Sequence, residues 1–119
     1  MSYNFNNDVP IYLQIIEHIK ILIISNKYLP NEKIPSVREL SLEFNVNPNT
    51  IQKALAELEN IGLITTERTN GKFVTNNLKI IKQITKETID NKINEFLNSM
   101  KHMGIDKNEV LEILTKRYR

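Results

Sequence analysis

The segment IPSVRELSLEFNVNPNTIQKALAELENIGLITTERTNGKFV, residues 34–74 of a chain of 119, decides the fold. Its first half predicts two helices, because each helix start carries a capping signal. Ser36 followed by Glu39 forms a capping box, in which each side chain accepts a hydrogen bond from the other residue's backbone N–H. Asn47 followed by Pro48 marks a second start, since asparagine caps helices and proline loses no hydrogen bond at the first helical position.

The apolar residues place one face of each predicted helix in a core, because they recur every three or four positions. In the first helix they are Val37, Leu40 and Phe44, and in the second Ile51, Ala54, Leu55, Leu58 and Ile61. Asn45, which tolerates the left-handed conformation, ends the first helix, and Gly62 ends the second. So short a turn lets the second helix project into the major groove of DNA.

A hairpin follows the helix pair. Residues 63–67 and 72–76 alternate between apolar and polar side chains, and Thr69, Asn70 and Gly71 supply a turn between them. Two helices joined by a tight turn and followed by a hairpin predict a winged helix-turn-helix.

A helix over residues 10–25 precedes this segment, and its isoleucines and leucines cover more than one face. Such a helix is buried on more than one side, either as the central core helix or with a contribution to a subunit interface. Residues 1–8 are predicted to be a loose arm, from which Tyr3 and Phe5 can dock locally.

Beyond residue 77 the pattern predicts two further helices. The first carries an apolar stripe and ends at Gly104; the second starts at a capping box of Asp106 and Glu109 and ends in cations, including Lys116, Arg117 and Arg119, that suit its dipole. Two helices cannot bury this stripe alone. We expect them to pack against the same helices of a second chain as a two-fold dimer, the alternative being that they fold back onto the first helix. The expected interface residues are Ile84, Ile89, Ile93, Phe96, Leu97, Met100, Val110, Leu111 and Leu114.

The predicted fold class is therefore mainly α with a small β-wing. The N-terminal winged helix-turn-helix domain takes residues 1–76. The two-helix tail of residues 77–119 serves dimerisation and regulation.

By its fixed spacings, the chain resembles the GntR family of bacterial transcription regulators over about residues 9–76. The positions that carry the resemblance are Pro10, Tyr12, Gln14, Ile15, Pro35, Ser36, Arg38, Glu39, Leu40, 46–50, Lys53, Ala54, Leu58, Glu59, 62–64, Gly71, Phe73 and Val74. The spelling VNPNT and the short tail look most like the YtrA subfamily. The resemblance implies a homodimeric repressor that binds an inverted-repeat operator. It also implies that the protein regulates a neighbouring transporter operon.

Three turns depart from the family pattern, two after the first helix and one at the wing tip. Asn26 and Asn31 stand where the family commonly has glycine, and the wing tip holds one glycine, Gly71, where two are common. After glycine, asparagine is the residue best suited to positive φ, so we expect the turns at Asn26 and Asn31 to form.

The candidate DNA contacts lie on three elements. Asparagine and glutamine can bond bidentately to adenine, lysine can bond guanine, a threonine methyl can pack on thymine, and arginine can bind guanine or phosphate. Asn47, Asn49, Thr50, Gln52 and Lys53 face outward on the second helix, Ser36 and Arg38 lie on the first, and Arg68, Asn70, Gly71 and Lys72 form the wing. The plainer alternatives are that Asn47 only caps the helix and that Asn49 and Lys53 are solvated surface residues.

Charge supports this interpretation by its distribution and not by its sum. Residues 1–76 contain seven Lys or Arg and eight Asp or Glu, a net charge of −1, while residues 77–119 contain nine and six, a net charge of +3. Residues 44–56, however, hold no acid. We therefore expect weak non-specific DNA binding and dependence on dimerisation. The near-neutral domain charge also favours the rival hypothesis of a winged helix that binds proteins.

Other chemistries find little support. The chain has no cysteine, His18 and His102 lack spaced ligand partners, and no glycine-rich phosphate loop is present. We expect no catalytic residues, no metal, no cofactor, no signal peptide and no membrane segment, and a cytoplasmic location. Two helices offer little enclosure for a pocket, so we expect any small-molecule effector to bind between tail and DNA-binding domain or across the dimer interface.

Overall fold

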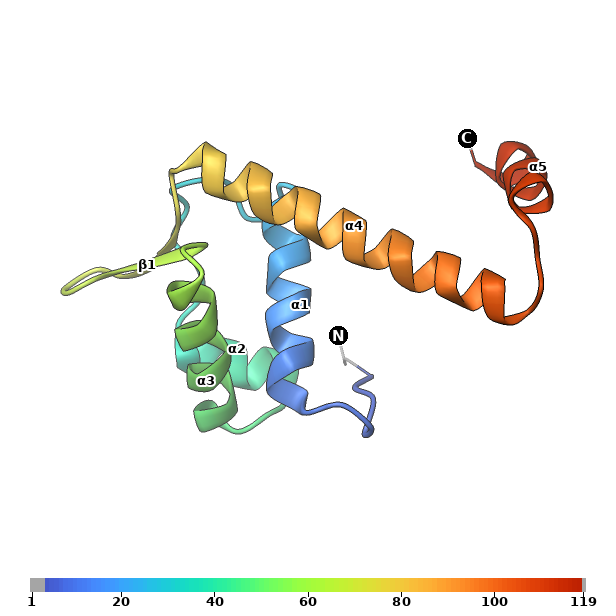
Figure 1. Ribbon diagram of the computed structural model, residues 1–119. Coiled ribbons are helices and arrows are strands. Elements are labelled where there is room, and N and C mark those ends of the chain that lie inside the picture. The colour runs from blue at the N-terminus through green and yellow to red at the C-terminus, as the bar shows by residue number, and fades with distance from the viewer. Residues whose placement is uncertain (1–3, 119) are drawn as a thin grey trace. The chain divides into compact units, whose positions relative to one another are not determined.

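The computed structural model describes residues 4–118 and shows a mainly helical protein with a small antiparallel sheet (Figure 1). The elements are α1 (Ile11–Ile24), α2 (Val37–Phe44), α3 (Pro48–Asn60), β1 (Ile64–Glu67), β2 (Gly71–Val74), α4 (Leu78–His102) and α5 (Lys107–Arg117). This confirms the predicted fold class. Tyr3 and Arg119, which the sequence placed in the arm and at the last helix end, lie outside the described residues.

The helix boundaries follow the predicted capping chemistry. The Ser36 hydroxyl accepts from the Glu39 N–H at 3.1 Å and the Glu39 carboxylate accepts from the Ser36 N–H at 3.1 Å, so the capping box of α2 is complete. The Asn47 side chain accepts from the Asn49 N–H at 2.8 Å and caps α3, with Pro48 in its first turn. At α5, Asp106 accepts from the Glu109 N–H at 2.9 Å.

Three asparagines adopt the left-handed conformation that the turns require. Asn26, Asn31 and Asn45 have φ of 63°, 68° and 56°. The first two stand at the positions where the family commonly has glycine, so the turns form as predicted. Asn45 gives the tight connection between α2 and α3.

Residues up to Lys82 form one compact unit around a core from α1, α2, α3 and the sheet. Ile15 and Ile19 of α1, Leu40 of α2, and Ile51 and Leu58 of α3 are each at most 1% exposed. The predicted role of α1 as a central core helix is thus confirmed, although Leu13 and Ile21 remain partly exposed on its other side. The Phe5 ring of the arm contacts Phe44, with centroids 6.2 Å apart.

The wing contains one more strand-like segment than the sequence predicted. β1 and β2 pair from Ile64 with Val74 to Glu67 with Gly71. On the other edge of β2, the Ile34 N–H donates to the Lys72 carbonyl at 3.0 Å and the Val74 N–H donates to the Glu32 carbonyl at 2.8 Å. The segment leading into α2 is therefore fastened to the wing by backbone hydrogen bonds.

The second compact unit comprises residues from Gln83 onward, so the division lies inside α4, whereas the sequence suggested a boundary after residue 76. α4 ends before Gly104, which has φ of 72° as the predicted stop requires. Among residues 4–118 no helix has both the length and the apolar character needed to cross a bilayer.

Candidate nucleic-acid interface

The first turns of α3 present the polar side chains that the sequence assigned to base reading. Asn47, Asn49, Gln52 and Lys53 are exposed, and Thr50 is half-buried. Ile51, Ala54, Leu55 and Leu58 hold the opposite face of the helix in the core. α3 thus combines a fixed apolar side with a free polar side, as a recognition helix must.

Asn47 has a structural role in addition to any contact with DNA. Its side-chain oxygen accepts from the Asn49 N–H, so the amide group is held over the first turn of α3 while one lone pair and both amide hydrogens remain available. An asparagine held in this way is not free to turn its oxygen and its amide nitrogen together toward adenine, as the two-point contact requires. Asn49 and Gln52 are therefore better placed for that contact.

At the start of α2, Arg38 is exposed and Ser36 is fixed by its capping bonds. Hydrogen bonds from the backbone N–H of Ser36, then from its side chain, hold the pKa of Glu39 below its ordinary value. The carboxylate is therefore ionised at neutral pH and committed to the helix cap. This favours the predicted capping role of Glu39 over any acid-base role.

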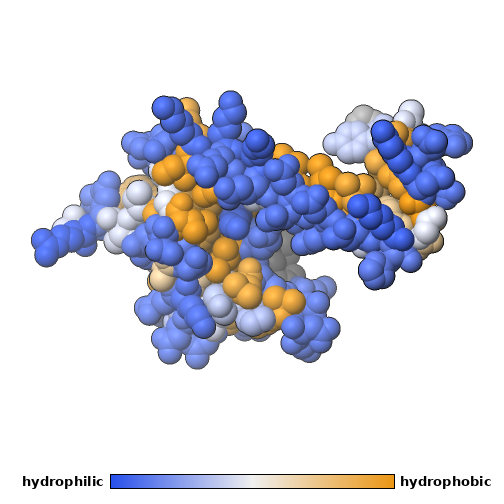
Figure 2. Space-filling model, viewed as in Figure 1, coloured by the Kyte–Doolittle hydropathy of each residue, from blue (hydrophilic) through white to orange (hydrophobic). Residues whose placement is uncertain are grey.

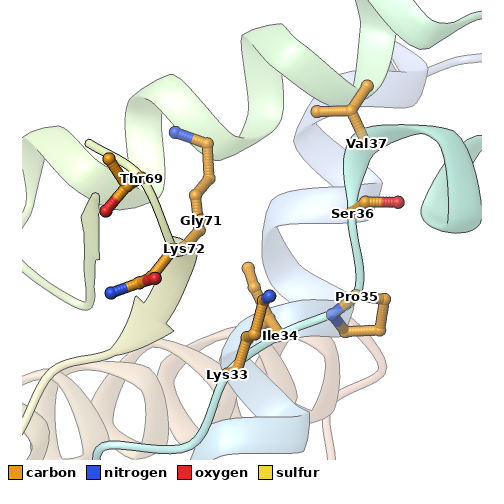
Figure 3. A pocket seen from close by; sticks show the side chains of 9 residues that line it. Lys33, Ile34, Pro35, Ser36, Val37, Thr69, Gly71 and Lys72 are labelled. Atoms are coloured by element: carbon orange, nitrogen blue, oxygen red, sulfur yellow. The ribbon is translucent and has the colours of Figure 1, made fainter. Parts of the chain in front are cut away.

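A cleft of about 370 Å³ separates the start of α2 from the wing tip (Figure 3). Lys33 and Ser36 line one side, and Thr69, Asn70 and Gly71 line the other. Gly71 has φ of 99°, and a β-carbon built there would lie 3.2 Å from Cε of Lys33. Glycine is required here by its conformation, and its small size leaves room for the lysine stem.

Lys72 points from the wing toward α3 rather than standing free (Figure 3). Its ammonium lies 2.6 Å from Oε1 of Glu59 and donates to the Thr66 hydroxyl at 2.8 Å. The Thr66 hydroxyl in turn donates to Glu59. We call these three residues the wing clamp, because they join the sheet to the end of α3. The Lys72 and Thr66 hydrogen bonds hold the pKa of Glu59 below its ordinary value.

The outer part of the wing carries the remaining predicted contacts. Arg68, Asn70 and Gly71 are exposed, and Nδ2 of Asn70 donates to the Glu67 carboxylate at 3.2 Å. The Asn70 N–H also donates to the Glu67 carbonyl at 3.3 Å, which closes the turn. The tip therefore presents Arg68 and the Gly71 backbone on an ordered turn.

Sequence reasoning missed two features of this surface. One is the wing clamp, whose members lie up to 13 positions apart on different elements. The other is a contact between the Lys53 ammonium and the Tyr12 ring, whose centroid lies 4.0 Å from Nζ. No sequence signal could have found either, because helical or strand periodicity pairs only near neighbours.

The tail places most of the predicted dimer residues along one groove. Ile84 and Val110 are buried within the chain, and Met100 is partly buried. Ile89, Ile93, Phe96, Leu97, Leu111 and Leu114 are each between 39% and 50% exposed. An apolar groove of about 400 Å³ runs between α4 and α5, and hydrophobic surface is visible on both helices (Figure 2).

Comparison with known proteins agrees with this geometry. The sequence model of the bacterial regulatory proteins of the gntR family matches residues 11–74. The uncharacterized HTH-type transcriptional regulator YhcF of Bacillus subtilis is 36% identical over 112 residues, which cover 94% of this chain and 93% of YhcF. The HTH-type transcriptional repressor YtrA of Bacillus subtilis is 44% identical over 73 residues, which cover 61% of this chain and 56% of YtrA.

Solved structures show the same likeness. A GntR family transcriptional regulator from Listeria monocytogenes superposes with a TM-score of 0.88 at 36% identity, covering 94% of this chain and 98% of that one. The DNA-binding domain of AraR in complex with operator ORX1 superposes with a TM-score of 0.58 at 33% identity, covering 63% of this chain and 95% of that domain. The fold, the capped helix pair, the wing and these matches together establish that the chain belongs to the GntR family of bacterial transcription regulators.

Proposed function

We propose that the protein is a sequence-specific DNA-binding transcription regulator that acts as a repressor. The observation that carries the proposal is the exposed polar face of the first turns of α3, where residues 44–56 hold no acid and the core holds the opposite side of the helix. The likeness to the AraR DNA-binding domain, solved in complex with operator DNA, supports the same use of this surface. As a binder of chromosomal DNA, the protein would act in the cytoplasm.

Each element then has its own part in DNA recognition. Asn49 and Gln52 of α3 read base edges in the major groove, and Arg38 of α2 binds a phosphate or guanine at its border. Arg68 and the Gly71 backbone approach the minor groove. The Thr50 hydroxyl donates to a phosphate, and the Ser36 hydroxyl does so while its oxygen keeps the capping hydrogen bond from the Glu39 N–H. Lys72 serves DNA binding indirectly, since the wing clamp fixes the orientation of the wing.

The functional unit is a homodimer formed through the tail. Six of the predicted interface side chains, on α4 and α5, are exposed to solvent in the single chain, which is the signature of an interaction surface. A second copy supplies an equally apolar face, and a two-fold axis presents two recognition helices to an inverted repeat with half-sites about one helical turn apart.

An effector site at this dimer interface is part of the proposal. The groove between α4 and α5 is nearly all apolar, so it suits an apolar small molecule whose binding alters the spacing of the two recognition helices. The control of a neighbouring transporter operon stays a prediction of the family resemblance.

The test is a titration of the protein into labelled DNA from upstream of its own gene, with scrambled competitor, at two salt concentrations. We expect saturable binding that survives competitor, weakens with salt and footprints an inverted repeat. Arg38→Ala and Gln52→Ala should each weaken specific binding by about 1–3 kcal/mol while the urea midpoint stays unchanged. Glu57→Gln, on an exposed α3 residue outside the proposed contacts, is the control.

The rival function is a winged helix that binds another protein, and the net charge of −1 over residues 1–76 favours it. Under that function no preference over scrambled DNA would appear at either salt concentration, and Gln52→Ala would change neither DNA binding nor regulation. Loss of specific binding with the fold intact excludes it.

A further inference from the structure

Tyr12 and Lys53 bring together two elements that have separate roles in the fold. Tyr12 is the second residue of α1, and Lys53 lies in the middle of α3. The Lys53 ammonium stands 4.0 Å from the centroid of the Tyr12 ring, well inside the range of about 6 Å for a cation–π interaction. We propose that Tyr12 is a positioning residue for DNA binding, which holds the Lys53 ammonium ready for a backbone phosphate of the operator. The proposal rests on the proposed function.

Lys53 keeps its positive charge available for an anion outside the protein. Within residues 4–118 no carboxylate pairs with its ammonium, and residues 44–56 contain no acid. An aromatic ring attracts a cation through its quadrupole and carries no net charge to cancel it. The side chain is therefore held in place while its full positive charge remains available to an outside anion.

The contact with Tyr12 also sets the direction of the Lys53 side chain. Tyr12, Asn49, Thr50 and Lys53, together with Ile11, line a hollow of about 300 Å³ between the first turns of α1 and α3. Gln52 is exposed on α3 but does not line this hollow. The ring therefore draws Lys53 to the α1 flank of the recognition helix, where the sugar–phosphate backbone beside the groove would pass, and leaves Gln52 to face base edges.

The contact with Tyr12 also lowers the entropy cost of ordering Lys53 on DNA. A free lysine loses much side-chain freedom when it binds one phosphate, and a side chain that is already ordered loses less. Removing the ring should therefore weaken DNA binding about threefold to tenfold, even though Tyr12 itself touches no DNA. This is a different assignment from the guanine contact expected of Lys53 from sequence.

The experiment measures affinity for the footprinted upstream duplex by fluorescence anisotropy between about 50 and 300 mM KCl, because phosphate contacts dominate the salt dependence of DNA binding. Lys53→Gln should weaken binding, lower the salt slope by about one per subunit and leave base preference unchanged. Tyr12→Leu should weaken binding about threefold to tenfold, and Tyr12→Phe should keep nearly full affinity. Lys27→Gln, the same change in an exposed lysine beyond the other end of α1, is the control.

The double variant separates positioning from direct contact. If Tyr12 acts through Lys53, adding Tyr12→Leu to Lys53→Gln should cost less than about twofold more. Full additivity overturns the proposal, as does an equal loss in Tyr12→Phe, which would mean that the hydroxyl itself binds DNA. A relaxed base preference in Lys53→Gln would indicate that Lys53 contacts guanine, and it would also overturn the proposal.

One measurement on the unaltered protein keeps the proposal testable if Tyr12→Leu fails to fold. The ring current of Tyr12 should shift the Cε protons of Lys53 upfield of those of Lys27 in the free protein. Unshifted protons would show that the lysine is not held, and would overturn the proposal. Absence of specific DNA binding by the unaltered protein would instead contradict the proposed function. The chemical shift is measured without DNA, so the two results can be told apart.

Discussion

At the scale of single residues, the wing clamp shows how an ion pair at the surface can fix the direction of a whole element. Glu59, in the last turn of α3, has a carboxylate that contacts both Lys72 and Thr66 of the sheet. The carboxylate is partly exposed, so solvent screens the pair and its contribution to stability is small, about 0.2–1 kcal/mol. Its importance lies in the geometry of the wing.

The clamp makes a small part of the stability depend on pH. The pKa of Glu59 is lowered in the folded protein, so its contribution is fully present above about pH 4.3, the ordinary value of an unfolded glutamate, and is lost as pH falls through the lowered pKa. We expect Glu59→Gln to destabilise by about 0.5 kcal/mol at pH 7 and by less near pH 3. Urea unfolding at a series of pH values measures the difference.

Glu57→Gln on the same helix is the control, because Glu57 is exposed and takes no part in the clamp. The two variants should differ at pH 7 and converge in acid. A difference between them that is constant from pH 3 to pH 7 would contradict the ionised clamp.

At the scale of elements, the wing depends on one glycine in a conformation that other residues rarely adopt. Gly71 has φ of 99°, and a β-carbon there would press on the Lys33 stem. Lys33 and its neighbours also pair with β2 through backbone hydrogen bonds. A change at the wing tip is therefore felt at the entrance to α2, which lies across the same cleft.

We expect Gly71→Ala to destabilise the protein by about 1 kcal/mol, because alanine is strained at positive φ. Gly104→Ala is the matched control, since Gly104 also has positive φ, 72°, but would place its β-carbon in open space. Both variants should lower the urea midpoint, and only Gly71→Ala should also weaken DNA binding. Equal DNA affinity in the two variants would contradict a DNA contact at Gly71.

At the scale of the whole molecule, the apolar surface of the tail is the feature that a single chain leaves unused. Five apolar side chains that line the groove remain between 39% and 49% exposed: Ile93, Phe96, Leu97, Leu111 and Leu114. Burying such side chains stabilises association by about 1.5–3 kcal/mol each at most. Several of them together are enough to hold a dimer.

Phe96→Asp should therefore abolish the proposed dimer, because it places a charge in the apolar groove. We expect sedimentation equilibrium to give twice the chain mass of 13.9 kDa for the unaltered protein and the single mass for the variant. Asn98→Asp adds the same charge to α4 at an exposed position outside the groove and should remain dimeric. If the Phe96→Asp protein remains dimeric, the dimer interface lies elsewhere on the molecule.

The sequence determined the helices, their ends and the order of elements, because capping, left-handed turns and apolar periodicity act between residues a few positions apart. Ser36 with Glu39, Asn47 with Pro48, and Asn45 all took the predicted conformations. The candidate DNA-contacting surface was likewise predicted as a set of outward positions on α3 and the wing, and the structure leaves most of those side chains exposed.

Only the tertiary structure decided which of these side chains have partners already. The Glu59–Lys72 pair, the Tyr12–Lys53 contact and the pairing of residues 31–34 with β2 each join segments that are distant along the chain. Such contacts depend on how helices and strands pack, and packing is set by the whole core rather than by local pattern. Sequence therefore gave the candidates for DNA contact, and the fold distinguished the side chains that are held from those that are free.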